Sequence, residues 1–314
     1  EQIKEVIKQE YIKCAKDSAY FMKKYCMIQH PIQGKIPFEL YDFQEKSITE
    51  FQEHRMNIIL KARQLGISTL TAGYSLWLMT FHQDKNVLVI ATKQEVAKNL
   101  VTKVRVMHAN LPSWLKQRCV EDNKLNLRYR NGSQIKAVSS GPEAARSEAL
   151  SLLILDEAAF IDRIDSIWTA AQSTLTTGGQ CIALSTPNGV GNWFHKTWVD
   201  AEEGRGMFNP IKLHWTVHPD RDEDWRKEQD TLLGPSSAAQ ECDCDFLTSG
   251  TGVIDAVLLE KLRKEQCIEP VEKRGIDSNM WVWEQPNYSK DYIVCADVSR
   301  GDGTDYSAFH VIEL

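Results

Sequence analysis

The chain has 314 residues and a formal net charge of −6, with 42% hydrophobic and 25% charged residues. These values are ordinary for folded domains, suggest roughly two of them, and argue against a protein that coats nucleic acid over its whole surface, although a local basic groove is compatible with them. No apolar run is long enough to cross a bilayer. Eight scattered cysteines, without zinc-type C-x-x-C pairs, predict reduced thiols in a cytoplasmic protein. Because the chain starts at Glu1 without a methionine, we expect it to be part of a longer protein.

The first part of the chain predicts helices followed by an aromatic segment. Residues 1–27 carry apolar side chains at helical spacing, and Pro31 interrupts the pattern. The segment 37–44 is rich in aromatic residues and predicts a short helix ending in Gln44. A glutamine amide offers a donor and an acceptor to the edge of an adenine. Gln44 is therefore a candidate purine contact, and the alternative is a solvent-facing helix residue.

A strand, a turn and a helix follow between residues 56 and 81. The apolar run 56–60 stops abruptly, a turn with Gly66 comes next, and a helical pattern covers 70–81. Exposed backbone N–H groups in such a turn, together with a helix N-terminus, bind phosphates. This stretch is either a nucleotide site or an ordinary connection in an α/β domain.

The turn only half matches the P-loop pattern G-x-x-x-x-G-K-[ST]. Gly66 and Ser68 stand at their expected positions, whereas Lys61 replaces the first glycine and Ile67 replaces the phosphate-binding lysine. Arg63 is the nearest cation inside the loop. A phosphate site here would draw its positive charge from somewhere other than position 67.

The pattern between this stretch and residue 146 predicts more sheet. A buried strand is expected over 86–92 and a helix over 95–108. Two strands, 124–129 and 134–138, flank an Asn-Gly pair and predict a β-hairpin. A polar loop then begins at residue 140.

Two acids end the next strand, which is predicted over 151–155 and is followed by Asp156 and Glu157. A strand that is apolar on both faces belongs in a central parallel sheet, and acids outside its carboxyl end lie where such sheets bind ligands. In P-loop ATPases the first acid holds Mg²⁺, and a second can polarise the attacking water. The alternative is a helix N-terminus with acids in its first turn.

The strand 179–185 leads into the polar turn 185–189, which is placed to sense the γ-phosphate if the preceding acids hold a nucleotide. In isolation this sequence is simply a favourable turn. After it the pattern predicts a helix over 193–201, a strand over 211–215, and helices over 224–233 and 236–244.

The pattern changes after a small-residue hinge candidate at 248–252. A strand over 292–298 carries Asp297, and a Gly-rich turn leads into a second strand over 305–312. Two-metal nucleases of the ribonuclease H type open in this way. The further acids of such a site are not found before Leu314, so we expect a nuclease in this form to be inactive.

Taken in order, these motifs resemble those of the large terminase subunit of tailed bacteriophages, most closely the myovirus type. The matching pieces are A-R-Q-L-G-I-S-T, D-E-A-A-F, S-T-P-N-G, the W-x₉-W spacing that ends at Trp225, F-L-T-S-G and C-A-D-V-S-R-G-D-G-T-D-Y. The resemblance covers nearly the whole chain, from about Phe38 to Leu314.

The resemblance implies an α/β fold: an ASCE-type (RecA-like) P-loop ATPase with a mostly parallel sheet and a small helical subdomain, followed by an incomplete ribonuclease H-like nuclease. The ATPase domain would cover 1–248, with its core at 37–190 and the helical subdomain at 1–36 and 191–248. Residues 249–290 would be a hinge or linker, and 291–314 the start of the nuclease. The family is an ATP-driven motor that pumps double-stranded DNA into a procapsid. Implied partners are DNA, the portal protein, the small terminase subunit and further copies in a ring, all in the host cytoplasm without a membrane.

Residue roles follow where this sequence matches the family's motifs. Gln44 would contact adenine, Asp156 and the Ser68 hydroxyl would hold Mg²⁺, and Glu157 would be the catalytic carboxylate. The ATP phosphates would be bound by Lys61, Arg63, Gln64, Gly66, Ile67, Ser68 and Thr69. Ser185, Thr186 and Asn188 would belong to a coupling motif, and Asp297 with Asp305 would bind Mg²⁺ or Mn²⁺ in the nuclease.

This sequence departs from the family at Ile67, where many members have lysine. We expect Arg63, helped by Lys61, to supply the missing charge, since a guanidinium matches phosphate oxygens. An arginine finger is also expected, because such a residue raises the rate by on the order of 10³–10⁵. Arg146 is the candidate for it, and the alternative is a surface or DNA-facing charge.

Two other functions compete with this interpretation. A helicase with two RecA-like domains would share the Gln motif and the D-E-A box, but it needs a second such domain after residue 189. A non-catalytic assembly module that lost its lysine is supported only by Ile67, and retention of both Asp156 and Glu157 speaks against it.

Overall fold

The computed structural model describes residues 1–141, 149–176, 178–246, 265–266, 268–275, 279–299 and 307–314. Arg146, Asp305 and the hinge candidate 248–252 lie outside these residues. The chain divides into two compact units, Glu1–Ala256 and Val257–Leu314, which are taken separately. Within the described part, no helix is long and apolar enough to span a membrane.

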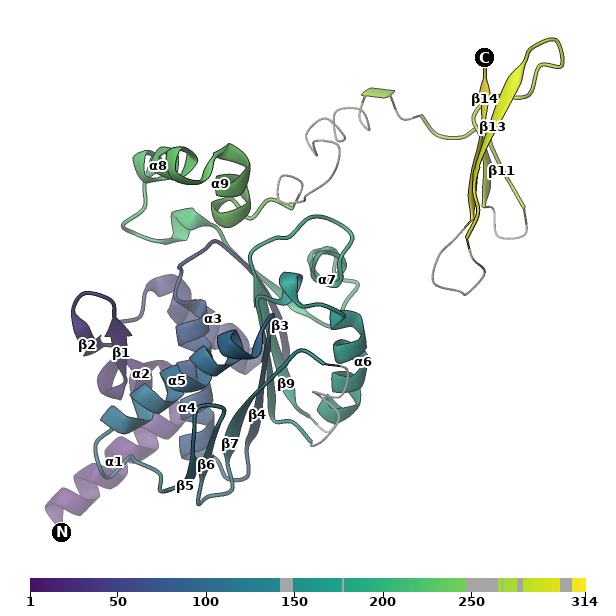
Figure 1. Ribbon diagram of the computed structural model, residues 1–314. Helices are drawn as coiled ribbons and strands as arrows, with labels where there is room; N and C mark the ends of the chain where they lie inside the picture. The colour runs from purple at the N-terminus through teal and green to yellow at the C-terminus, as the bar shows by residue number, and fades with distance from the viewer. Residues whose placement is uncertain (142–148, 177, 247–264, 267, 276–278, 300–306) are drawn as a thin grey trace. The chain divides into compact units, whose positions relative to one another are not determined.

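An eight-stranded sheet forms the centre of the first unit (Figure 1). Its order is β10-β3-β9-β8-β4-β7-β6-β5. The strands from β10 to β7 are parallel, and β6 and β5 continue the sheet in antiparallel pairing. The mostly parallel α/β sheet predicted from the sequence is therefore confirmed. The strands are β3 Met56–Lys61, β4 Asn86–Ala91, β5 Cys119–Asp122, β6 Asn126–Tyr129, β7 Gln134–Val138, β8 Leu152–Asp156, β9 Gln180–Ser185 and β10 Asn209–Leu213.

Helices cover both faces of this sheet (Figure 1). One face packs against α3 (Asp42–Glu53), α4 (Ile67–Phe81) and α5 (Gln94–Asn110). The other packs against α6 (Ile164–Leu175) and α7 (Trp193–Glu202). Successive strand residues point to opposite faces, so Ile154 belongs to the first core and Leu153 and Leu155 to the second. Burial on both faces explains why these strands read as continuous apolar runs.

The N-terminal segment is helical over most of residues 1–27, as predicted, but it forms two helices followed by a hairpin. Two helices, α1 (Gln2–Lys16) and α2 (Ser18–Tyr25), precede a hairpin of β1 (Met27–His30) and β2 (Gly34–Pro37). The helices separate at Asp17, whose side chain accepts a hydrogen bond from the Tyr20 N–H at 2.8 Å. An aspartate in this role favours the start of a new helix over continuation of the old one.

The segment 191–248 is not purely a helical subdomain either. Its strand β10 pairs in parallel with β3 over five positions and so belongs to the central sheet, and α7 covers the second core. The strand predicted over 211–215 is thus observed, two residues earlier, at 209–213, but its short apolar pattern does not indicate that it joins the central sheet. The helices beyond it are α8 (Glu223–Leu233) and α9 (Pro235–Cys242).

The second unit consists of two strand pairs in its described residues. β13 (Tyr292–Asp297) and β14 (Ala308–Glu313) pair antiparallel, which confirms the hairpin predicted there. β11 (Glu272–Arg274) and β12 (Met280–Val282) form another antiparallel pair inside the segment predicted as a hinge or linker. Asp297 ends β13 opposite Ala308 and is exposed.

Candidate functional site

Several of the predicted site residues of the first unit meet at the carboxyl edge of the sheet. Strand β9 lies between β3 and β8, with Leu60 opposite Ser185 and Leu184 opposite Asp156. Because all three strands are parallel and in register, their last residues reach the same edge. Lys61, Asp156 and Ser185 are thereby brought together from positions far apart in the sequence.

The loop between β3 and α4 presents unpaired backbone donors. The N–H groups of residues 64–68 donate to no acceptor within the described residues. Two left-handed residues, Gln64 (φ 58°) and Gly66 (φ 73°), turn the chain so that consecutive amides lie close together. Such a turn before a helix N-terminus binds anions, and α4 begins at the next residue, Ile67.

Glycine is required at position 66 for a second reason besides its left-handed φ. A Cβ there would lie 2.8 Å from Nε2 of Gln44. That amide is only 3% exposed, donates to the Leu65 carbonyl at 3.0 Å, and accepts from the Tyr41 N–H at 3.2 Å. Gln44 lies in the first turn of α3 and not at the end of a short helix, so that prediction is wrong. Its side chain supports the loop by these hydrogen bonds and does not face solvent. Its role at an adenine remains a prediction.

Ser68 and Asp156 form a pair suited to a magnesium ion. The Ser68 hydroxyl donates to Oδ1 of Asp156 at 3.1 Å. Burial, and next the charge of Glu157, raise the pKa of Asp156 to about 6. Proteins commonly bind Mg²⁺ through one or two carboxylates together with substrate phosphates. The donor set fits that mode, and no cluster of three or more His, Cys, Asp or Glu suited to a metal occurs in the described residues.

Glu157 is held between the last residue of β3 and the 185–189 turn. Its Oε1 pairs with Nζ of Lys61 at 2.9 Å. Its Oε2 lies 3.4 Å from both the Ser185 hydroxyl and the Thr186 N–H, which donate to it. The residue has φ 54°, a left-handed conformation that is uncommon for a glutamate and that occurs disproportionately at functional sites.

The 185–189 turn is tied to the segment that follows the acids. The Ala159 N–H donates to the Ser185 hydroxyl at 3.2 Å, and the Asn188 amide donates to the Ala159 carbonyl at 3.0 Å. Gln240 of α9 donates to the Pro187 carbonyl at 2.9 Å. The turn therefore contacts both the acidic segment and the C-terminal helices of the first unit.

The remaining predicted residues take different places. Ile67 is 1% exposed and packs into the first core, so only its backbone N–H is available to a ligand. The Arg63 side chain is 61% exposed and lies 3.9 Å from Glu241. Thr69 is half-buried at the start of α4.

Sequence reasoning misses two residues that contact this site, Arg221 and Gln240. Arg221 donates from Nη1 to the Arg63 carbonyl at 3.0 Å and from Nη2 to the Gln64 carbonyl at 3.1 Å. The Trp-rich motif around position 221 is visible as a family signature, but nothing in the sequence places it against the loop.

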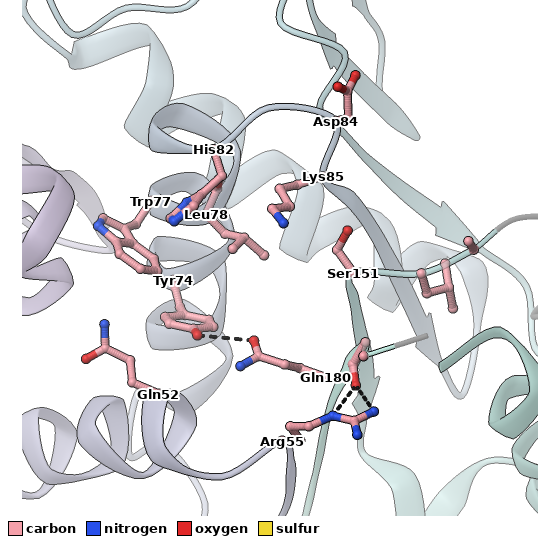
Figure 2. Close-up of a pocket in the computed structure, with 14 residues that line it drawn as sticks. Gln52, Arg55, Tyr74, Trp77, Leu78, His82, Asp84, Lys85, Ser151 and Gln180 are labelled. Carbon is pink, nitrogen blue, oxygen red and sulfur yellow. Dashed lines mark hydrogen bonds between the residues drawn. The ribbon is translucent and has the colours of Figure 1, made fainter. Parts of the chain in front are cut away.

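A cavity of about 600 Å³ opens at the opposite, amino edge of the sheet (Figure 2). Its wall includes the last turns of α4 and residues that immediately precede strands, among them Arg55, Lys85 and Ser151. The Arg55 guanidinium donates to the Gly179 carbonyl at 3.1 Å. Figure 2 shows the Tyr74 hydroxyl donating to the side chain of Gln180. The cavity is thus separate from the carboxyl edge, where parallel sheets bind ligands.

The fold and the carboxyl edge together define an α/β domain with a phosphate-loop-like turn and a pair of acids on a neighbouring strand. Residues 58–261 match the family model described as "Terminase large subunit, T4likevirus-type, N-terminal". The chain therefore belongs to the family of phage terminase large subunits.

Individual relatives agree with this assignment. The terminase large subunit of Thermus virus P23-45 is 30% identical over 190 residues, which cover 55% of this chain and 36% of that protein. The large terminase ATPase domain of Thermus phage P74-26 shares the fold, with a TM-score of 0.55 and 21% identity over 67% of this chain and 94% of that one. The large terminase of a thermophilic bacteriophage in complex with ADP gives a TM-score of 0.55 and 12% identity, over 88% and 65% of the two chains. The chain thus spans about a third of the length of the first of these relatives.

Proposed function

We propose that the first unit binds Mg²⁺-ATP at the carboxyl edge of its sheet and hydrolyses it. The observation that carries the proposal is the meeting of unpaired amides 64–68 with the Ser68–Asp156 pair. The amides would hold the phosphates, and Ser68 and Asp156 would hold the metal. Bound Mg²⁺ would neutralise phosphate charge, as it does in P-loop enzymes generally.

Glu157 is the residue proposed to orient the attacking water. It is 32% exposed in its side chain, adjoins the metal-binding acid, and is kept in place by Lys61 and the 185–189 turn. Arg63 is proposed to reach the β- and γ-phosphates, because its exposed guanidinium is bound only loosely by Glu241. Ser185, Thr186 and Asn188 are proposed to relay the loss of the γ-phosphate, since they contact Glu157 and Ala159.

We propose further that this ATPase is the motor of a DNA-packaging terminase in the host cytoplasm. The motor would move double-stranded DNA into a procapsid as a ring of copies that contacts the portal protein and the small terminase subunit. Arg146 is proposed as the arginine finger. The hairpin β13–β14 is proposed as the start of a ribonuclease H-like endonuclease, with Asp297 and Asp305 binding Mg²⁺ or Mn²⁺. Family membership and the hairpin pairing support these statements.

The test compares the unchanged chain with Glu157→Gln, Asp156→Ala and Arg63→Ala. We expect Glu157→Gln to bind Mg²⁺-ATP but not turn it over, Asp156→Ala to lose the magnesium dependence of binding, and Arg63→Ala to lose most of the affinity. Equilibrium binding and phosphate release give the two readouts. Unchanged hydrolysis in both acid variants would refute the proposed site, and equal binding by Arg63→Ala would assign the charge to another residue.

A further inference from the structure

Arg221 lies outside the β3–α4 loop in sequence but holds two of its consecutive carbonyl groups. Its two terminal nitrogens donate to the Arg63 and Gln64 carbonyls at 3.0 and 3.1 Å. The guanidinium is itself positioned by Trp225, whose ring centroid lies 4.4 Å from its Cζ. Trp225 in turn belongs to the first turn of α8, where its N–H donates to the Asp222 side chain.

The geometry of the peptide bond connects these carbonyls to the unpaired amides. In a trans peptide the carbonyl points opposite to the N–H of the next residue. Arg221 therefore determines the direction of the Gln64 and Leu65 N–H groups by holding the two carbonyls before them. Gln44 does the same for the Gly66 N–H through the Leu65 carbonyl.

The backbone conformation of the loop also needs stabilising contacts from other segments, because Gln64 is left-handed, with φ 58°. A residue with a Cβ is disfavoured in that conformation. Hydrogen bonds to a charged donor are among the stronger ones in proteins. The two bonds from Arg221 offset the strain and keep the loop in the shape that exposes its donors.

Arg221 further adds positive charge near a loop that has isoleucine at the lysine position. Within the described residues no carboxylate pairs with its guanidinium, which contacts the two carbonyls and the Trp225 ring. By contrast, Lys61 is paired with Glu157. The charge of Arg221 is thus not neutralised by a neighbouring acid.

We propose that Arg221 is a positioning residue for the phosphates of the bound nucleotide. It holds the Arg63 and Gln64 carbonyls so that the following N–H groups point into the phosphate site. This inference rests on the proposed nucleotide site, and it adds a residue from beyond the sheet to that site.

The experiment measures binding of Mg²⁺-ATP and of magnesium tripolyphosphate to the full chain and to Arg221→Ala, Arg221→Lys and Lys227→Ala. Lys227 is the matched control, because it is an exposed cation on α8, the helix that begins two residues after Arg221 and contains Trp225. We expect both Arg221 variants to bind each ligand about tenfold more weakly, since the single ammonium nitrogen of lysine does not reproduce the planar fork whose two terminal nitrogens each reach one carbonyl, and Lys227→Ala to bind normally. Full affinity in Arg221→Lys would mean that charge alone matters, and full affinity in Arg221→Ala would mean that the residue is dispensable. Either result overturns the proposal.

A crystal structure of Arg221→Ala without nucleotide separates this inference from the proposed function. If the unchanged chain binds neither ligand, the proposed nucleotide site is wrong, but the loop conformation in the variant can still be compared with that in the unchanged chain. We expect Gln64 to leave the left-handed region in the variant while the sheet is unchanged. A loop that keeps its shape would overturn the role of Arg221, whatever the chain binds.

Discussion

Replacing Asp156 by asparagine should stabilise the nucleotide-free protein. Asp156 is 5% exposed, and its pKa is raised from 3.8 to about 6. A raised carboxyl pKa means that the ionised group is less favourable in the folded than in the unfolded chain. Two pKa units correspond to about 3 kcal/mol. The free energy of unfolding is lower by this amount at pH 8, and the loss disappears as the pH falls from 6 to below 3.8.

Asparagine keeps an oxygen that can accept the Ser68 hydrogen bond, but it carries no charge at any pH. The amide nitrogen introduces a buried donor of its own, which reduces the gain to about 1–3 kcal/mol at pH 8. The assay is urea unfolding in EDTA at pH 8 and at pH 4.5, with Asp162→Asn as a control at an exposed acid in the same connection. The gain should shrink strongly at pH 4.5, where Asp156 is largely protonated.

Two results would refute this reasoning. A loss of stability at pH 8 would mean that the ionised carboxylate is well satisfied in the fold, against its burial beside Glu157. An equal gain at both pH values would mean that the effect comes from packing and not from charge. The variant should in either case lose magnesium-dependent nucleotide binding if the proposed site is correct.

Three further substitutions test other parts of the first unit. Gly66→Ala should weaken Mg²⁺-ATP binding by about tenfold or more, because the left-handed conformation disfavours alanine by about 1–2 kcal/mol and the new Cβ would contact Gln44. Equal affinity of the variant and the unchanged chain in a titration would contradict this. Lys61→Met should lower the free energy of unfolding, because Glu157 and the buried Asp156 lose a neighbouring positive charge. It should also lower kcat about tenfold, because Glu157 loses its partner, and unchanged turnover in a steady-state assay would exclude the pair from the reaction. Ile154→Ala should lower the free energy of unfolding by about 2–5 kcal/mol, because the side chain is fully buried in β8; a smaller loss in urea unfolding would mean that the core collapses onto the space.

The central elements could be predicted because each has a strong local signal. The strand before Asp156 is apolar throughout, and the Asn131-Gly132 pair joins strands that the structure pairs antiparallel. Helix α4 is also expected from the sequence, although it starts three residues earlier than its apolar pattern, at Ile67. These features depend on neighbouring residues, and so they are readable from one sequence.

Other features depend on contacts between distant segments and could not be read in this way. The pairing of β10 with β3 brings residues 209–213 beside 57–61 without a distinctive local pattern. The burial of Gln44 arises from the Leu65 carbonyl, which lies 21 positions later. Arg221 likewise reaches the loop only because of how the chain folds before α8. Its hydrogen bonds are to backbone carbonyls, so they do not require particular residue types in the loop that a sequence could reveal.

The position of β10 has a consequence for how the protein can be shortened. All of the described motif residues from Gln44 to Asn188 precede residue 190, so a chain ending there would keep every one of them. It would nevertheless expose the edge of β3 that β10 occupies and remove the buried rings of Trp193 and Phe194 from the second core. An unprotected, apolar edge strand is a template for aggregation. The smallest soluble version of the domain should therefore retain the segment through α9, even though its most recognisable sequence motifs lie earlier.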